Sequence, residues 1–183
     1  MKNNSYQKEI TSSVQTLKPV ITILGVGNIL MRDEGVGVHA VKAFQERYVV
    51  PDEVEIVDGG TTGFGLLEYF AEREKVLIVD AVNFGKEPGY IDLVENESIP
   101  ARFGTKASMH HLGLLEVISV TNLMGSGPKE LCLIGIQPKT MELGLDMTPE
   151  IWDKVEVVID RMVAKLREWN VSCVLRSPQK SSR

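Results

Sequence analysis

The residues best suited to chemistry in this sequence are carboxylates that follow apolar runs of the chain. They are Asp33 and Glu34 after a first run, Asp58 after a second, and Asp80 after a third. Carboxylates gathered at one place repel one another unless a cation or a shared proton offsets their charge. The set therefore predicts a metal site or acid–base chemistry between carboxylates.

Histidine, the other candidate metal ligand, occurs only three times. His39 lies within a helical pattern, where we expect an exposed or interface side chain. His110 and His111 precede another helical pattern, where either could cap the helix, or one could bind a metal while the other packs. Imidazole and carboxylate donors together suit borderline divalent ions such as nickel, zinc or cadmium. The sequence has no HExxH and no Gly-x-Ser-x-Gly, so neither an ordinary zincin nor a serine hydrolase is predicted.

Two glycine-rich loops hold the first carboxylates. The loop at 25–37 starts as Gly-x-Gly, but Leu30 stands where a dinucleotide-binding loop needs Gly or Ala. We interpret this loop as a tight turn that presents Asp33 or Glu34 at the start of a helix; alternatively, Asp33 only caps that helix. The loop at 58–63 has consecutive glycines, which permit close approach of a ligand or form an ordinary Asp-Gly turn.

Apolar, β-branched runs predict the strands that position these residues. Short continuous runs are typical of strands covered on both faces, as in a parallel sheet. Helical patterns alternate with them, so we predict a three-layer α/β/α sandwich around a twisted, mostly parallel sheet of about five strands. Ligands bind such sheets beyond the carboxyl ends of the strands, where the strand order reverses. The expected strands are 20–26, 54–57, 76–79, 90–94 and 131–136.

Helices are expected at 36–48, 66–70, 112–123 and 149–169. The last is the best marked, with Thr148 as its cap, Pro149 at the first helical position and Glu150 in the first turn. An apolar stripe then continues along it to Trp169.

Composition indicates one reduced α/β domain. We expect a polar N-terminal extension at 1–18, a single domain at 19–172 and a polar C-terminal tail at 173–183. The 20 Lys and Arg against 25 Asp and Glu give a net charge of −5, which argues against a nucleic-acid partner.

Cys132 lies in an apolar run and is expected to be a buried thiol in a reducing compartment. No run suits a membrane span or a signal peptide, so we expect no membrane partner and a cytoplasmic location.

An ordered set of motifs resembles the nickel–iron hydrogenase maturation endopeptidases. From about residue 20 to 169 the chain reads GVGNILMRDEGVGVHAV, VEIVDGGTTGFGLL, VLIVDAV, Pro88-Gly89, SMHHLGL and LIGIQP. The resemblance implies a small cytoplasmic protease with a twisted sheet between helices. It implies removal of a short C-terminal extension from the hydrogenase large subunit precursor after nickel has been inserted.

The same resemblance implies a metal-contacting set of Glu34, Asp80 and His110. The family's PHQLGL-like stretch reads MHHLGL here, so a second imidazole, His111, follows the first. Adjacent residues of a helix point about 100° apart, so we expect one imidazole to face the cleft. We favour His110, with His111 against the sheet flank or in solvent.

The implied partner is the nickel-loaded precursor, which supplies the nickel, and the protein is expected to be a monomer. Zinc or cadmium is expected to substitute in the isolated protein. Asp58, Glu34 and Asp80 are the three candidates for the general base. The sequence does not choose between an aspartic-type and a metal-dependent mechanism. Two other functions stay open: a nickel-binding checkpoint or chaperone without hydrolysis, and a nucleotide-binding α/β enzyme.

Overall fold

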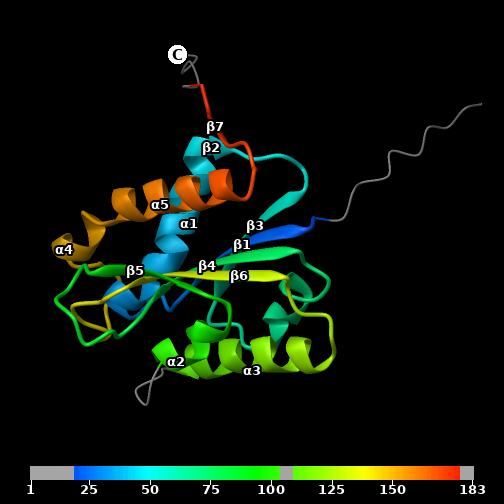
Figure 1. Ribbon diagram of the computed structural model, residues 1–183. Coiled ribbons are helices and arrows are strands. Elements are labelled where there is room, and N and C mark those ends of the chain that lie inside the picture. The colour runs from blue at the N-terminus through cyan, green and yellow to red at the C-terminus, as the bar shows by residue number, and fades with distance from the viewer. Residues whose placement is uncertain (1–18, 104–108, 178–183) are drawn as a thin grey trace, which may run out of the picture.

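A five-stranded sheet forms the centre of the protein, as the apolar runs predict (Figure 1). In the computed structural model, which describes residues 19–103 and 109–177, the strand order is β3-β1-β4-β6-β5. The first four of these pair in parallel, and β5 pairs antiparallel with β6 at one edge. The predicted fold class is confirmed. The strands are β1 (Ile21–Val26), β3 (Val54–Gly60), β4 (Lys75–Ala81), β5 (Ile91–Glu95) and β6 (Glu130–Ile136).

Helices cover both faces of the sheet (Figure 1). On one face lie α1 (Val36–Arg47) and α5 (Val155–Glu168), and their apolar side chains join one buried cluster. On the other lie α2 (Ile99–Phe103), α3 (Met109–Leu123) and the 3-10 helix η2 (Phe64–Tyr69), which contribute to a second cluster. The predicted helix at 66–70 is thus this 3-10 helix, which begins and ends slightly earlier.

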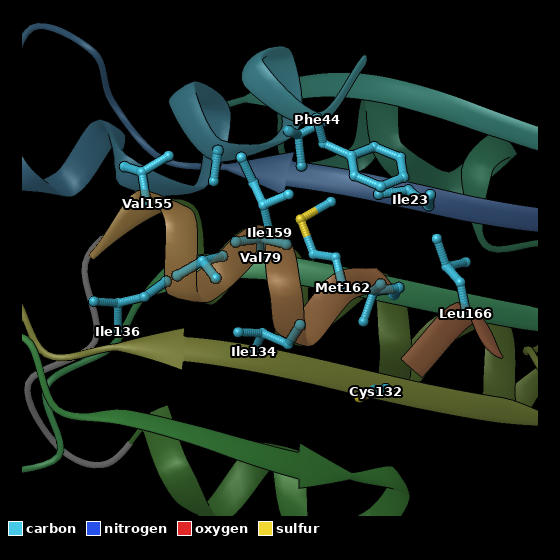
Figure 2. Close-up of a cluster of buried hydrophobic side chains, with 14 of the residues drawn as sticks. Ile23, Phe44, Val79, Cys132, Ile134, Ile136, Val155, Ile159, Met162 and Leu166 are labelled. Atoms are coloured by element: carbon cyan, nitrogen blue, oxygen red, sulfur yellow. The ribbon is translucent and has the colours of Figure 1, made fainter. Parts of the chain in front are cut away.

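The central strands are buried on both faces because each contributes side chains to both buried clusters. In β4, Leu77 and Val79 belong to the cluster under α5, whereas Val76 and Ile78 belong to the cluster over α3. Successive side chains of a strand point to opposite faces, so a strand covered twice is apolar at most positions. Figure 2 shows the first cluster, in which Met162 of α5 lies over the sheet.

The last predicted helix is two helices. The segment α4 (Pro149–Trp152) ends before α5 begins, and the amide of Lys154 donates to the carbonyl of Ile151 over 3.0 Å. This i→i−3 bond tightens the chain between the two helices. Ile151 and Val155 are nevertheless buried in the same cluster, which is why a single apolar stripe ran through both.

Small elements complete the described part. The 3-10 helices η1 (Arg32–Gly35) and η3 (Asn96–Ser98) precede α1 and α2. A two-stranded sheet pairs β2 (Tyr48–Val49) with β7 (Val174–Leu175), which falls within the segment expected to be a polar tail. The expected extension at 1–18 lies outside the described residues, as does 178–183 of the tail.

Two further expectations concern burial and membranes. Cys132 is buried and free, and burial raises the pKa of its thiol to about 12. Among the described residues, no helix has both the length and the apolar character needed to cross a bilayer.

Candidate active site

The switch point of the sheet lies between β1 and β4. The chain leaves β1 for β3 on one side and leaves β4 for β5, beyond β6, on the other, so the two connections diverge. Such a point is where open α/β sheets bind ligands. Glu34 follows β1 in η1, and Asp80 is the next-to-last residue of β4. The structure therefore brings these two predicted carboxylates to the predicted edge.

Close packing of α1 against both strands places Glu34 at this point. A Cβ on Gly37 would lie 2.1 Å from the carbonyl oxygen of Val79 and 2.3 Å from that of Val26. Only glycine permits this approach, so the start of α1 sits between the ends of β4 and β1. Gly27 has φ +134°, and a Cβ there would lie 1.9 Å from the carbonyl oxygen of Glu34. Glu34 is buried in the turn between these glycines.

Asp80 is buried at the carboxyl end of β4 beside a histidine. Its Oδ1 accepts a hydrogen bond of 2.7 Å from the amide of Ala81, and its Oδ2 lies 3.1 Å from Nε2 of His111. The same Nε2 lies 3.0 Å from the carbonyl oxygen of Ala81. A carbonyl oxygen can only accept, so Nε2 donates to Ala81, and the imidazole holds the end of β4.

His111 thus lies beside Asp80, the position at which we expected His110. It is buried against the end of β4 and away from solvent. His110 is the second residue of α3, but its side chain lies outside the described residues, so its role as a ligand stays a prediction. Within 19–103 and 109–177, no described cluster of three His, Cys, Asp or Glu side chains is placed to hold a metal ion.

Asp33 does not cap the helix that follows it. No side-chain cap bond is present at η1 or α1. Instead, Oδ2 accepts hydrogen bonds from the amides of Lys139 and Thr140 over 3.0 and 3.1 Å, and Oδ1 accepts one from the amide of Thr148 over 2.7 Å. Asp33 is fully buried, so these bonds satisfy a carboxylate that water cannot reach.

Thr148 corrects a second expectation. It occupies the N-cap position of α4, yet its hydroxyl makes no cap bond and instead donates to Oδ2 of Asp33 over 3.0 Å. Pro149 and Glu150 take their predicted places in the first turn. The loop after β6 is thereby held to η1, the turn that carries Glu34.

Asp58 lies at the same edge but in a different environment. Its side chain is exposed, its Oδ2 forms an ion pair of 2.7 Å with Nζ of Lys42, and its Oδ1 accepts from the amide of Gly60 over 3.1 Å. Asp58, Gly59 and Gly60 are the last residues of β3, so the Asp-Gly turn expected after the strand is not formed; the chain turns one step later, where the amide of Thr62 donates to the carbonyl of Gly59 over 3.0 Å. His39 is half-buried, and its ring centroid lies 6.2 Å from that of Trp152. Burial, followed by the charge of Lys42, lowers the pKa of His39.

One residue that the sequence analysis did not single out shapes this edge. Gln137 is buried after β6, and its Oε1 accepts hydrogen bonds from the amides of Phe84 and Lys86 over 2.7 and 3.3 Å. It therefore fixes the loop that follows β4. A polar residue directly after an apolar run was the signal that identified Asp80, and Gln137 carries the same signal.

Comparisons with known proteins agree on one family. A family model described as hydrogenase maturation protease matches residues 38–165. The chain is 45% identical over 159 residues to a hydrogenase expression/formation protein of Bradyrhizobium diazoefficiens, covering 86% of this chain and 83% of that protein. It is 41% identical to the hydrogenase 2 maturation protease of Escherichia coli, covering 85% and 96%.

A solved structure gives the same result. The hydrogenase maturating endopeptidase HybD from E. coli superposes with a TM-score of 0.81 at 41% identity, covering 85% of this chain and 97% of that one. The fold, the edge that carries Glu34 and Asp80, and the extent of these matches lead to one assignment. The chain belongs to the hydrogenase maturation protease family, whose members are endopeptidases.

Proposed function

We propose that this protein removes the C-terminal extension of a nickel–iron hydrogenase large subunit precursor once nickel has been inserted. In this proposal Glu34, Asp80 and His110 contact the nickel that the precursor carries. Membership of the maturation protease family supports the class of reaction. The observation that carries the proposal is the burial of two carboxylates at the switch point of the sheet.

Burial explains why a cation on the substrate would matter. A buried carboxylate is costly unless hydrogen bonds or an opposite charge compensate it. Asp80 has one oxygen on the amide of Ala81 and the other near His111. A nickel ion brought by the precursor would add the compensating charge at this edge. Nickel is then part of the substrate, and it reports that the precursor is ready for cleavage.

The carboxylates also suit the chemistry of peptide hydrolysis. A bound metal ion polarises a carbonyl or lowers the pKa of water. A carboxylate oxygen of Glu34 or Asp80 would accept the proton of the attacking water and pass it to the leaving amine. Asp58 stays a candidate base, but its ion pair with Lys42 and its exposure favour the two buried carboxylates. The choice between an aspartic-type and a metal-dependent route belongs to this proposal.

The test is incubation of the protein with nickel-loaded and nickel-free precursor, followed by intact mass measurement. We expect the loaded precursor to lose the mass of its extension and the nickel-free precursor to stay whole. Nickel-dependent binding without any loss of mass would contradict the proposal and favour the non-hydrolytic checkpoint. Equal cleavage of both precursors would contradict the proposed recognition of nickel but would leave the proposed cleavage intact.

The protein is proposed to act as a monomer in the cytoplasm. Each precursor is cut once, which requires only a transient one-to-one complex. Light scattering of the purified protein tests the monomer, and detection of the protein in cell fractions tests the location.

A further inference from the structure

Exposed apolar side chains gather in two loops next to the candidate site. Leu143 and Leu145, in the loop after β6, are 82% and 70% exposed, and Ile29 and Leu30, in the loop after β1, are also exposed. Exposed apolar residues scattered singly are ordinary, but a group beside a candidate active site indicates an interaction surface. We call these four side chains, together with Trp152 of α4, the docking rim.

Backbone hydrogen bonds join the two loops of the docking rim. The amide of Arg32 donates to the carbonyl of Gly144 over 2.9 Å, and the amide of Gly144 donates to the carbonyl of Leu30 over 2.9 Å. These bonds form an isolated parallel bridge between Met31 and Gly144. The side chains from two distant parts of the sequence are therefore presented by one rigid support.

The same support carries the candidate site. Asp33 accepts hydrogen bonds from the loop after β6, as described above, and Glu34 is the next residue. Glu34 and Asp80 are buried, so a folded protein whose peptide reaches them must lie against the residues that surround this edge. The docking rim borders that approach, since Leu30 is four residues before Glu34.

A groove beside the docking rim adds a charge preference. Leu145 and Trp152 line a hollow of about 490 Å³, together with His39. Asp146 and Asp153 stand at the same hollow. Apolar walls with carboxylates beside them suit an apolar segment flanked by Lys or Arg.

We propose that the docking rim and its groove bind the folded body of the large subunit precursor through an apolar segment flanked by basic residues. This inference rests on the proposed function for the identity of the partner. The continuity of the docking rim with the η1 turn, and the acidic residues at the groove, favour this occupant over a second copy of the chain.

The experiment compares two matched double variants. Leu143→Asp with Leu145→Asp alters the docking rim. Leu123→Asp with Met124→Asp is the control, because these side chains are 89% and 66% exposed at the end of α3, at the opposite end of the sheet from α4 (Figure 1). Each variant is checked for folding by thermal unfolding. A third variant, Ile29→Ser with Leu30→Ser, tests the other loop.

Two quantities are measured with nickel-loaded precursor: the dissociation constant by biolayer interferometry, and the cleavage rate against precursor concentration by intact mass. We expect both docking-rim variants to weaken binding and raise the half-saturating concentration by about tenfold or more, as for the loss of central apolar contacts. The rate at saturation should change less than about twofold, because binding alone is removed. The control variant should match the wild type.

The outcomes separate this inference from the proposed function. If the wild type cleaves and all variants bind equally, the docking rim is overturned while the protease assignment stands. If the wild type binds through the docking rim but cleaves nothing, the proposed function fails and the docking rim stands. If the docking-rim variants change only the oligomeric state, a second copy is the occupant and the inference is overturned. A wild type that neither binds nor cleaves overturns both.

Discussion

At the scale of single residues, two neighbouring carboxylates of one turn have opposite tasks. Asp33 is fully buried, and both of its carboxylate oxygens accept hydrogen bonds from backbone amides and a hydroxyl of the loop after β6. Glu34 is buried at the switch point of the sheet, where substrates of such folds bind. Substitutions at the two positions should therefore fail in different ways.

Glu34→Gln and Asp80→Asn are each expected to slow precursor processing by about 100-fold or more, because each removes a charged oxygen needed as a ligand or base. Shape is nearly preserved, so the thermal unfolding transition should stay close to that of the wild type. Intact mass over time measures the processing. Asp160→Asn, an exposed carboxylate of α5, is the matched control and should leave the rate unchanged. A folded double variant that still processes would exclude these residues.

Asp33→Asn is expected to lower the free energy of unfolding by about 1–3 kcal/mol, because an amide nitrogen would meet backbone amides that need an acceptor. Urea unfolding measures this change, with the exposed Asp52→Asn as control. Processing should fall as well, since η1 loses its link to the loop after β6. Unchanged stability would show that the hydrogen bonds to Asp33 contribute little.

The two adjacent histidines should separate ligand binding from support. His110→Ala is expected to stop nickel-dependent processing. His111→Ala should lower the unfolding temperature, because the bond to the end of β4 is lost, while nickel-dependent processing continues. Cleavage and thermal unfolding of both variants provide the measurement. If His111→Ala alone abolishes cleavage in a folded protein, the imidazole that contacts nickel is His111.

At the scale of elements, the start of α1 is the part that positions the site. It lies so close to β1 and β4 that two carbonyl oxygens occupy the space of a side chain at Gly37. The loop after β6 then covers η1 from the other side through Asp33 and Thr148. The geometry of Glu34 therefore depends on three segments that are distant in the sequence.

Gly37→Ala should move α1 away from the strands and destabilise the fold by about 3 kcal/mol, the cost of forcing a methyl group into a filled space. Gln45→Ala is the control, because this side chain is exposed on the same helix. Urea unfolding and precursor cleavage of both variants test this. A Gly37→Ala protein with wild-type stability and activity would show that α1 can shift freely.

At the scale of the whole molecule, the proposed function makes the protein a scaffold that holds an incomplete metal site open to a second protein. The η1 turn and β4 each supply one carboxylate at this edge of the sheet, and the precursor is proposed to bring the ion and its remaining ligands. The docking rim lies along the same edge. Recognition and chemistry would then depend on a single approach of the precursor.

The isolated protein should accordingly bind nickel, zinc or cadmium only weakly, because three protein donors leave coordination positions open. Metal analysis after dialysis against a chelator is the measurement, with the Glu34→Gln variant as control. One equivalent of metal that survives the chelator would indicate a resident catalytic ion and contradict the proposed role of nickel as part of the substrate.

Local pattern was enough to predict the five strands of the central sheet, the fold class and the edge that carries Glu34 and Asp80, but not the short pair β2 and β7. A strand covered on both faces is apolar at most positions, and the polar residues where the apolar run stops mark the end of the sheet. These features depend on short stretches of chain, so they can be read without knowing what lies nearby in space.

Only the tertiary structure decided what the remaining polar residues do. Asp33 and Thr148 both suit helix caps, and their neighbours in sequence give no reason to think otherwise. They lie 115 residues apart and bond to each other because β6 returns the chain to the edge where β1 ends. The same return joins Leu30 to Gly144. His111 reaches Asp80 earlier in the chain, because α3 packs over the sheet before β6 begins. Such pairings arise from the order of strands in the sheet, and no local spacing encodes that order.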